Sequence, residues 1–112
     1  MITEIIVFDL PDGMTHEEVL ANYRRSAPNW RSNPDLIRKN YLYDAESRKA
    51  GGVYLWRDMA AARRARNDAW LERVRRTYGS EPVVQYFATP IIVDNALGRT
   101  IEEADARDQT SD

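Results

Sequence analysis

The most informative stretch of this sequence is KAGGVYLWR, residues 49–57. Two glycines come before a run in which every side chain is β-branched, aromatic or leucine, and the next charge is Arg57. A strand with one face in water would alternate polar and apolar residues. The pattern therefore predicts an interior β-strand whose two faces are both covered.

Around this segment the sequence predicts the order β-α-β-β-α-β in one domain. A first helix begins at His16, because Thr15 and Glu18 form a capping-box pattern. Apolar runs rich in β-branched and aromatic residues predict the other strands. These runs span residues 2–10, 36–44 and 82–93.

The second helix is predicted from Asp58, a favourable N-cap, to Tyr78, with Gly79 as a left-handed C-cap. Helical winding places Arg63 and Asn67 inside its apolar stripe. Either these polar side chains face the core, or Asn67 caps a second helical segment and the two halves have separate faces. The second interpretation is the simpler one.

Two prolines limit the predicted elements. Pro28 is expected to break the first helix or to restart it as a short turn. Pro90 cannot donate to a central ladder, so it marks a bulge, an edge or a crossover to a different sheet. We expect the domain to cover residues 1–95. Residues 96–112 lack aromatic side chains and are rich in acidic ones, so we expect a disordered tail.

This element order is that of a ferredoxin-like α+β fold, an antiparallel sheet with two helices on one face. The other face would then be in water, yet the segments 2–10, 49–57 and 82–93 look apolar on both faces. We therefore expect a second copy of the chain to cover the open face. The two sheets would pack about a two-fold axis, and the extended fourth strand would reach across.

Composition removes several classes of function. The 112 residues include no cysteine, which excludes disulfides, thiolate catalysis and cysteine-based metal sites. The one histidine, His16, is expected at a helix start, so no metal site is predicted. The net charge of −2 argues against nucleic acid as the main partner. No signal peptide or membrane span is recognisable, and we expect a cytoplasmic protein with no membrane contact.

Gly51-Gly52 does not form a dinucleotide-binding loop, since it precedes a strand and lacks the GxGxxG spacing before a helix. A nucleophilic serine elbow is absent as well. These absences leave binding in a cavity as the basis of any activity.

Three stretches resemble a known family. AGGVYLW at 50–56, AWLERVRRTYGSEP at 69–82 and YFATPIIVDN at 86–95 are similar to the small monooxygenases of the dimeric α+β barrel superfamily, which includes antibiotic-biosynthesis monooxygenases. The resemblance covers residues 1–95. It implies a homodimer whose sheets form a closed barrel, with a cavity between sheet and helices in each subunit. It also implies oxidation of aromatic substrates by molecular oxygen without a metal, flavin or haem cofactor. Haem-degrading relatives need a histidine on the second helix, and this helix has none.

The predicted site is an aromatic cavity with a few polar groups. A cofactor-free oxygenase must bind a flat ring, favour its deprotonated form and exclude water. Arg38, Arg63 and Asn67 are the catalytic candidates for stabilising an oxyanion, and Asn40 is a further one. The resemblance supports an Asn, a Trp and an Arg by residue type only. The candidates for the walls of the cavity are aromatic, and they are Tyr23, Trp30, Tyr41, Tyr54, Trp56, Trp70, Tyr86 and Phe87.

Three functional hypotheses follow. The first is a cofactor-independent monooxygenase acting on a small aromatic or quinone-like metabolite. The second is a non-catalytic ligand-binding or stress-response homodimer whose cavity holds a hydrophobic molecule. The third, an isomerase or decarboxylating enzyme, would turn over without oxygen. Each aromatic candidate could instead be an ordinary core or interface residue.

Overall fold

The computed structural model describes residues 1–103, and its elements follow the predicted order with three additions. The second helix is divided in two, and two short strands follow the fourth strand. In chain order the elements are β1 (Ile2–Asp9), α1 (His16–Arg31), β2 (Leu36–Asp44), β3 (Lys49–Trp56), α2 (Met59–Ala65), α3 (Asp68–Tyr78), β4 (Val83–Ala88), β5 (Ile91–Asp94) and β6 (Arg99–Glu102).

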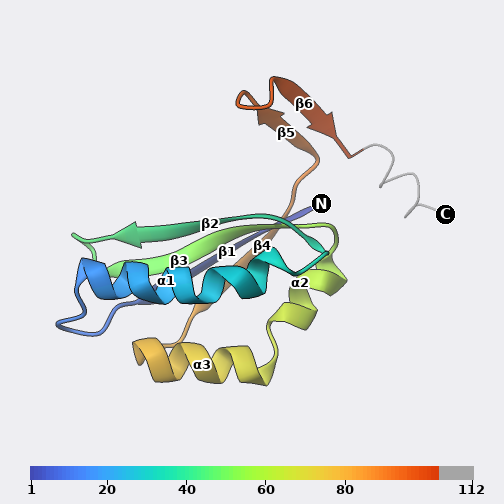
Figure 1. Cartoon of the computed structure of the whole chain (residues 1–112). Coiled ribbons are helices and arrows are strands. Elements are labelled where there is room, and N and C mark those ends of the chain that lie inside the picture. Colours follow the sequence, from blue (N-terminus) through green and yellow to red (C-terminus); the bar gives the residue numbers. More distant parts are fainter. Residues whose placement is uncertain (104–112) are drawn as a thin grey trace.

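The first four strands form one antiparallel sheet in the order β2-β3-β1-β4, so β3 lies in the interior as predicted. The helices α1 and α3 lie side by side on one face of this sheet, and α2 lies at its end (Figure 1). This arrangement confirms the ferredoxin-like α+β fold. It also gives the sheet an inner face toward the helices and an outer face away from them.

The prediction that Pro28 breaks the first helix is wrong, because α1 runs through it to Arg31. Proline removes the hydrogen bond to the carbonyl of Arg24, but Arg24 is exposed and water can take that place. The turn after the proline is held by Trp30, whose ring packs edge-on against Tyr54 at 5.2 Å between centroids. Tertiary packing therefore outweighs the local preference of the proline.

The predicted second helix is two helices joined at Arg66-Asn67. The side chain of Asn67 accepts a hydrogen bond from the backbone N–H of Trp70 at 2.9 Å, which makes it the N-cap of α3. This confirms the capping interpretation of the sequence. Arg66, the C-cap of α2, points inward at this break and pairs with the buried Glu4.

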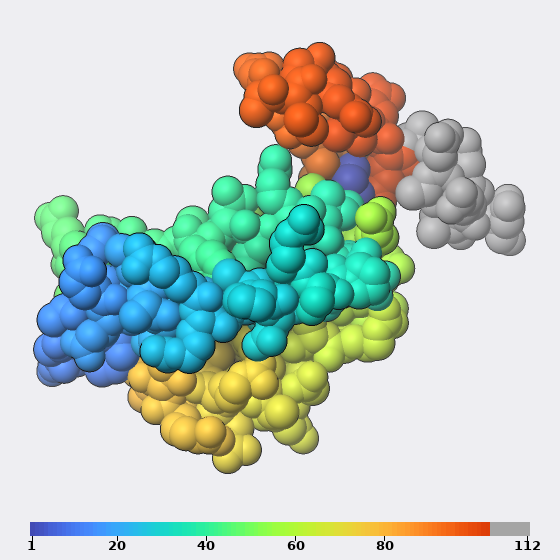
Figure 2. Space-filling view, viewed as in Figure 1, coloured from blue at the N-terminus to red at the C-terminus, as the bar shows by residue number. Residues whose placement is uncertain are grey.

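The segment 82–93 forms β4 and β5, and Pro90 lies between them at a crossover to a second sheet. β5 pairs with β6 in a two-stranded arm that stands away from the main sheet (Figure 2). We expected residues 96–112 to be a disordered tail, but residues 99–102 form β6. The strand β6 was not predicted because its segment has few apolar residues. A hairpin strand can form with few of them when the partner strand supplies the hydrogen bonds. The rest of that prediction, residues 104–112, lies outside the described residues.

A register shift in β2 decides which of its side chains face the helices. β2 and β3 pair with an irregularity between Leu36 and Arg38. Side chains alternate between faces along a strand, and an extra residue resets the alternation. Leu36 therefore shares the inner face with Lys39, Tyr41 and Tyr43, a set that neither simple alternation from the sequence contains.

The core lies between the inner face of the sheet and the helices. Its largest fully buried side chains are Trp56, Ile6, Val19 and Glu4, of which none is more than 1% exposed. Burial of a carboxylate at this depth requires a partner of opposite charge. That partner is Arg66, in the turn between α2 and α3.

Candidate functional site

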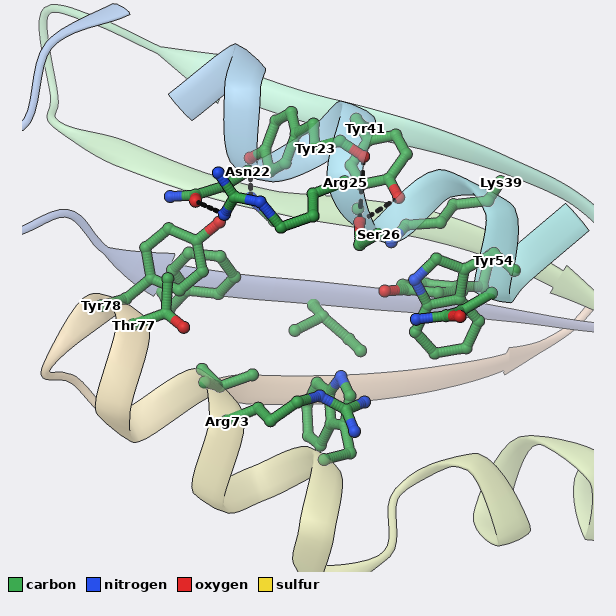
Figure 3. A pocket seen from close by; sticks show the side chains of 18 residues that line it. Asn22, Tyr23, Arg25, Ser26, Lys39, Tyr41, Tyr54, Arg73, Thr77 and Tyr78 are labelled. Atoms are coloured by element: carbon green, nitrogen blue, oxygen red, sulfur yellow. Dashed lines mark hydrogen bonds between the residues drawn. The ribbon is translucent and has the colours of Figure 1, made fainter. Parts of the chain in front are cut away.

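A cavity of about 250 Å³ lies between the inner face of the sheet and helices α1 and α3. We call it the ring cavity, because aromatic side chains form much of its wall (Figure 3). Its floor is β1, β2 and β3, and it includes Gly51 and Gly52. The residues that line it are Ile6, Phe8, Asn22, Tyr23, Arg25, Ser26, Asn29, Trp30, Lys39, Tyr41, Gly51, Gly52, Tyr54, Trp70, Arg73, Val74, Thr77 and Tyr78.

Five of the eight aromatic side chains proposed from the sequence for the cavity walls line this cavity. They come from four separate elements, and they are Tyr23, Trp30, Tyr41, Tyr54 and Trp70. The other three lie elsewhere, and Phe87 is half exposed on β4. Trp56 is fully buried beneath the cavity and donates its indole N–H to Glu4 at 2.8 Å. Tyr86 does not line the cavity; burial and then the Glu4 carboxylate raise its pKa.

The structure does not bring the three predicted catalytic residues together. Arg38 lies on the outer face of the sheet, where it pairs with Asp94 of β5 at 3.3 Å. Asn40 shares that face, two residues further along the strand. Arg63 is exposed on α2, and Asn67 is occupied as the N-cap of α3. None of them lines the ring cavity. Arg38 and Asn40 lie on the face of β2 opposite to Lys39 and Tyr41, since side chains alternate along a strand.

The cation that does enter the ring cavity is Lys39, which was not a candidate from the sequence. Its Nζ lies 4.6 Å from the ring centroid of Trp30, 3.7 Å from Tyr41 and 4.5 Å from Tyr54. Burial, followed by repulsion from Arg66, lowers the pKa of Lys39 to about 7, and Glu4 opposes this shift. At neutral pH this amine is therefore divided between its charged and neutral forms.

Arg66 and Glu4 form the buried ion pair next to this amine. The guanidinium donates from Nε to Oε2 at 2.8 Å and from Nη2 to Oε1 at 2.7 Å. Its Cζ also lies 4.3 Å from the ring centroid of Trp70 and 4.4 Å from that of Tyr54. A bidentate pair with stacked rings is rigid, so it fixes two walls of the cavity.

The tyrosine hydroxyls of the cavity act as donors. Tyr23 donates to the carbonyl of Leu42 at 2.6 Å and accepts from the N–H of Gly51 at 3.2 Å. Ser26 donates to the carbonyl of Tyr23, so the hydroxyl of Tyr41, 2.6 Å from Ser26 Oγ, donates to Ser26. Burial raises the pKa of Tyr23 to about 12 and also raises those of Tyr41 and Tyr54. These phenols stay protonated at neutral pH.

The mouth of the cavity carries positive charge. Arg25 from α1 and Arg73 from α3 line it, while no Asp or Glu of the described residues does. Neither arginine pairs with a carboxylate of residues 1–103, although Arg25 donates to Asn22 Oδ1 at 2.7 Å. Together with Lys39, these side chains make the cavity favourable for a ligand that carries or develops negative charge.

The described residues hold no group of three or more His, Cys, Asp or Glu that could bind a metal ion. Within the same part of the chain, no helix is long and apolar enough to cross a membrane. The groups that the ring cavity offers to a ligand are an amine and flat aromatic walls, because the hydroxyls of Tyr23 and Tyr41 already donate to Leu42 and Ser26.

The element order and sheet topology define the class of protein, a ferredoxin-like α+β domain. Among solved structures, SnoaB from Streptomyces nogalater, a cofactor-independent oxygenase, is similar with a TM-score of 0.59 and 20% identity over 79% of this chain and 91% of that one. A protein described as "a putative antibiotic biosynthesis monooxygenase" from Deinococcus radiodurans gives a TM-score of 0.66 at 6% identity, over 84% and 97% of the two chains. NE2512 from Nitrosomonas europaea, of unknown function, gives 0.64 at 17% identity, over 83% and 95%. At these identities the likeness establishes the fold.

The family is established by the sequence itself. The family model described as "Putative mono-oxygenase ydhR" matches residues 5–89, and this chain belongs to that family. The matched residues include both glycines and all the aromatic residues of the ring cavity. No curated protein matches the chain.

Proposed function

We propose that this protein is a cofactor-independent monooxygenase that oxidises a small phenolic or quinone-like aromatic compound in the ring cavity. The observation that carries the proposal is the cavity itself, with aromatic walls and a single amine inside. Membership of a family named for mono-oxygenases supports it. The oxygenase title of a structural neighbour on the same fold agrees with it.

The reaction needs no external reductant when the substrate supplies the electrons. An anthrone illustrates the balance: its CH₂ becomes C=O, one atom of O₂ enters the product, and the other leaves as water with the two hydrogens. Oxygen reacts with the carbanion or enolate form of such a ring, so the protein must favour loss of a proton. Flat walls and exclusion of water then protect the reactive anion.

Oxygen uptake with 1,8-dihydroxyanthrone tests the proposal, and Thr77→Trp is the matching variant. Thr77 is exposed on α3 and lines the cavity, so an indole there should obstruct the entrance without disturbing the core. We expect a loss of oxygen consumption of roughly tenfold, the effect of about 1.4 kcal/mol. Arg76→Trp on the same helix is the control, because Arg76 is exposed and outside the cavity. Equal uptake by both variants would place the reaction elsewhere.

A non-catalytic ligand-binding homodimer is the second candidate. It is favoured by the positions of Arg38, Arg63 and Asn67, none of which reaches the cavity. Native mass spectrometry of freshly purified protein separates the two functions. A bound small molecule that stays unchanged in air would support ligand binding, and consumption of oxygen by the loaded protein would support catalysis.

We also propose that a second copy of the chain covers the outer face of the sheet. Val83 and Phe87 of β4 are 63% and 51% exposed. The arm adds Ile91, Val93 and Leu97, of which each is more than half exposed. An apolar surface that runs from a sheet onto a projecting arm is typical of an interface between subunits.

The variant Phe87→Lys tests this interface by native mass spectrometry over a dilution series. We expect the wild-type chain to be a dimer. The dissociation constant of the variant dimer should be roughly hundredfold higher, since a charge would be buried without a partner. Ala69→Lys introduces the same charge on exposed α3 and should leave the dimer intact. A monomeric wild-type protein would contradict the proposal.

A further inference from the structure

The amine of Lys39 is in an unusual environment for a lysine. Its stem leaves the inner face of β2 and passes over Gly52, where a Cβ atom would lie 3.1 Å from Lys39 Cε. The Nζ ends among the rings of Trp30, Tyr41 and Tyr54. No carboxylate of residues 1–103 forms a salt bridge with it. A lysine that serves only the fold would reach solvent or an acidic partner.

Every element around this amine contributes to its balance of charge. β1 supplies Glu4, which attracts the ammonium form but is already held by both donors of Arg66. The turn after α2 supplies Arg66, which repels it. β2 and β3 supply the neutral phenols Tyr41 and Tyr54, and α3 supplies Arg73 at the mouth. α1 supplies the neutral Trp30 and Ser26, and Arg25 at the mouth.

The three ring faces partly replace water around the ammonium form, because each presents negative charge to a cation. They do not provide a full counter-ion. An oxyanion placed beside Nζ would provide one, and at low dielectric that pairing is strong. An oxyanion beside Nζ therefore favours the ammonium form of Lys39 more strongly than the empty cavity does.

We propose that Lys39 is the base of the ring cavity: its Nζ takes the proton of a phenolic or enolic hydroxyl and then holds the resulting oxyanion. In this step the O–H bond breaks, the proton joins the nitrogen lone pair, and the electron pair stays on oxygen. No oxidant takes part. The inference rests on the proposed function for its substrate class, phenols and enols, and it adds the residue that activates them.

The other polar groups of the cavity do not fit this role. The buried phenols of Tyr23, Tyr41 and Tyr54 keep their protons at neutral pH, as their raised pKa values show. The arginines stay protonated in proteins. The amine of Lys39 is the remaining group with a lone pair available near neutral pH, since burial and Arg66 lower its pKa to about 7.

The test uses 2-naphthol, because its ionised form absorbs at longer wavelength and its binding can be followed without oxygen. At pH 8 under nitrogen, we expect the wild-type protein to bind it with a naphtholate band and without releasing a proton to the buffer, since Lys39 receives that proton. Lys39→Arg is expected to show the band and to release about one proton for each molecule bound, because arginine is already charged. Lys39→Met is expected to show the neutral band.

Lys49→Met is the control, since Lys49 is an exposed lysine on the neighbouring strand that pairs with Asp9. It should behave as the wild-type protein does. A neutral band in the wild-type protein, no binding of 2-naphthol, or the same band in Lys39→Met would each overturn the proposal. A naphtholate band with release of a proton would also overturn it, because Lys39 would then only position the anion.

The test of Lys39 as a base and the test of oxygen uptake can give independent results. If 1,8-dihydroxyanthrone gives no oxygen uptake while 2-naphthol is ionised by Lys39, the base assignment stands and the monooxygenase assignment is withdrawn. If oxygen uptake is normal while Lys39→Met ionises 2-naphthol as the wild-type protein does, the converse holds.

Discussion

Replacing Glu4 with glutamine is expected to lower the free energy of unfolding by about 3–5 kcal/mol. Glu4 is completely buried and accepts hydrogen bonds from Trp56 and from both donating nitrogens of Arg66. Without its charge, the guanidinium of Arg66, whose side chain is only 8% exposed, would be buried without a counter-ion. Chemical denaturation at a fixed protein concentration measures the loss.

The control is Glu46→Gln in the exposed turn after β2, which should change stability by less than about 0.5 kcal/mol. The double variant Glu4→Leu/Arg66→Met separates charge from packing. We expect it to be more stable than Glu4→Gln, because two apolar residues leave no unpaired ion. Its recovery should be incomplete, since the indole N–H of Trp56 loses its acceptor. A Glu4→Gln variant as stable as the control would show that water reaches Arg66.

The second large effect is expected for Gly51→Ala, which should cost ~3 kcal/mol or more. A Cβ atom at this position would lie 1.8 Å from the carbonyl oxygen of Ile6 and 2.8 Å from its carbonyl carbon. Both atoms belong to the backbone of β1, so no side-chain rotation can relieve the contact. The strands β1 and β3 would have to separate at the floor of the ring cavity.

Gly13→Ala separates this clash from the effect of backbone conformation. Gly13 has φ +83° and no atom within 4 Å of a built Cβ, so only the left-handed conformation opposes alanine there. A loss of about 1–2 kcal/mol is expected. Thermal or chemical unfolding of both variants gives the comparison, and equal losses would mean that the sheet relaxes around the added methyl group at little cost.

Five of the aromatic candidates line the ring cavity, and local periodicity explains why the sequence could group them. Along a strand, side chains alternate between the two faces, so Tyr54 and Trp56 share one face. On a helix, residues seven apart share one face, as Tyr23 and Trp30 do. Local periodicity therefore groups aromatic side chains that face the interface between sheet and helices. The polar candidates had no such support. Arg38 was proposed as a catalytic residue from its residue type alone, and Lys39 beside it was not proposed. Lys39 nevertheless lies on the same face of the strand as the cavity candidate Tyr41. That pairing with Tyr41 was the available signal.

The sequence by itself determined the order of the elements, the interior position of β3, the N-cap Thr15 and an interruption of the last predicted strand at Pro90. These features depend on interactions within a few residues, or on apolar composition over one strand. Tertiary structure alone decided the continuity of α1 through Pro28, the bulge that places Leu36 on the same face as Lys39, and the pairing of Glu4 with Arg66 across 62 positions. Such features depend on contacts between distant segments, and the free energy of those contacts exceeds the local preferences from which a sequence can be interpreted.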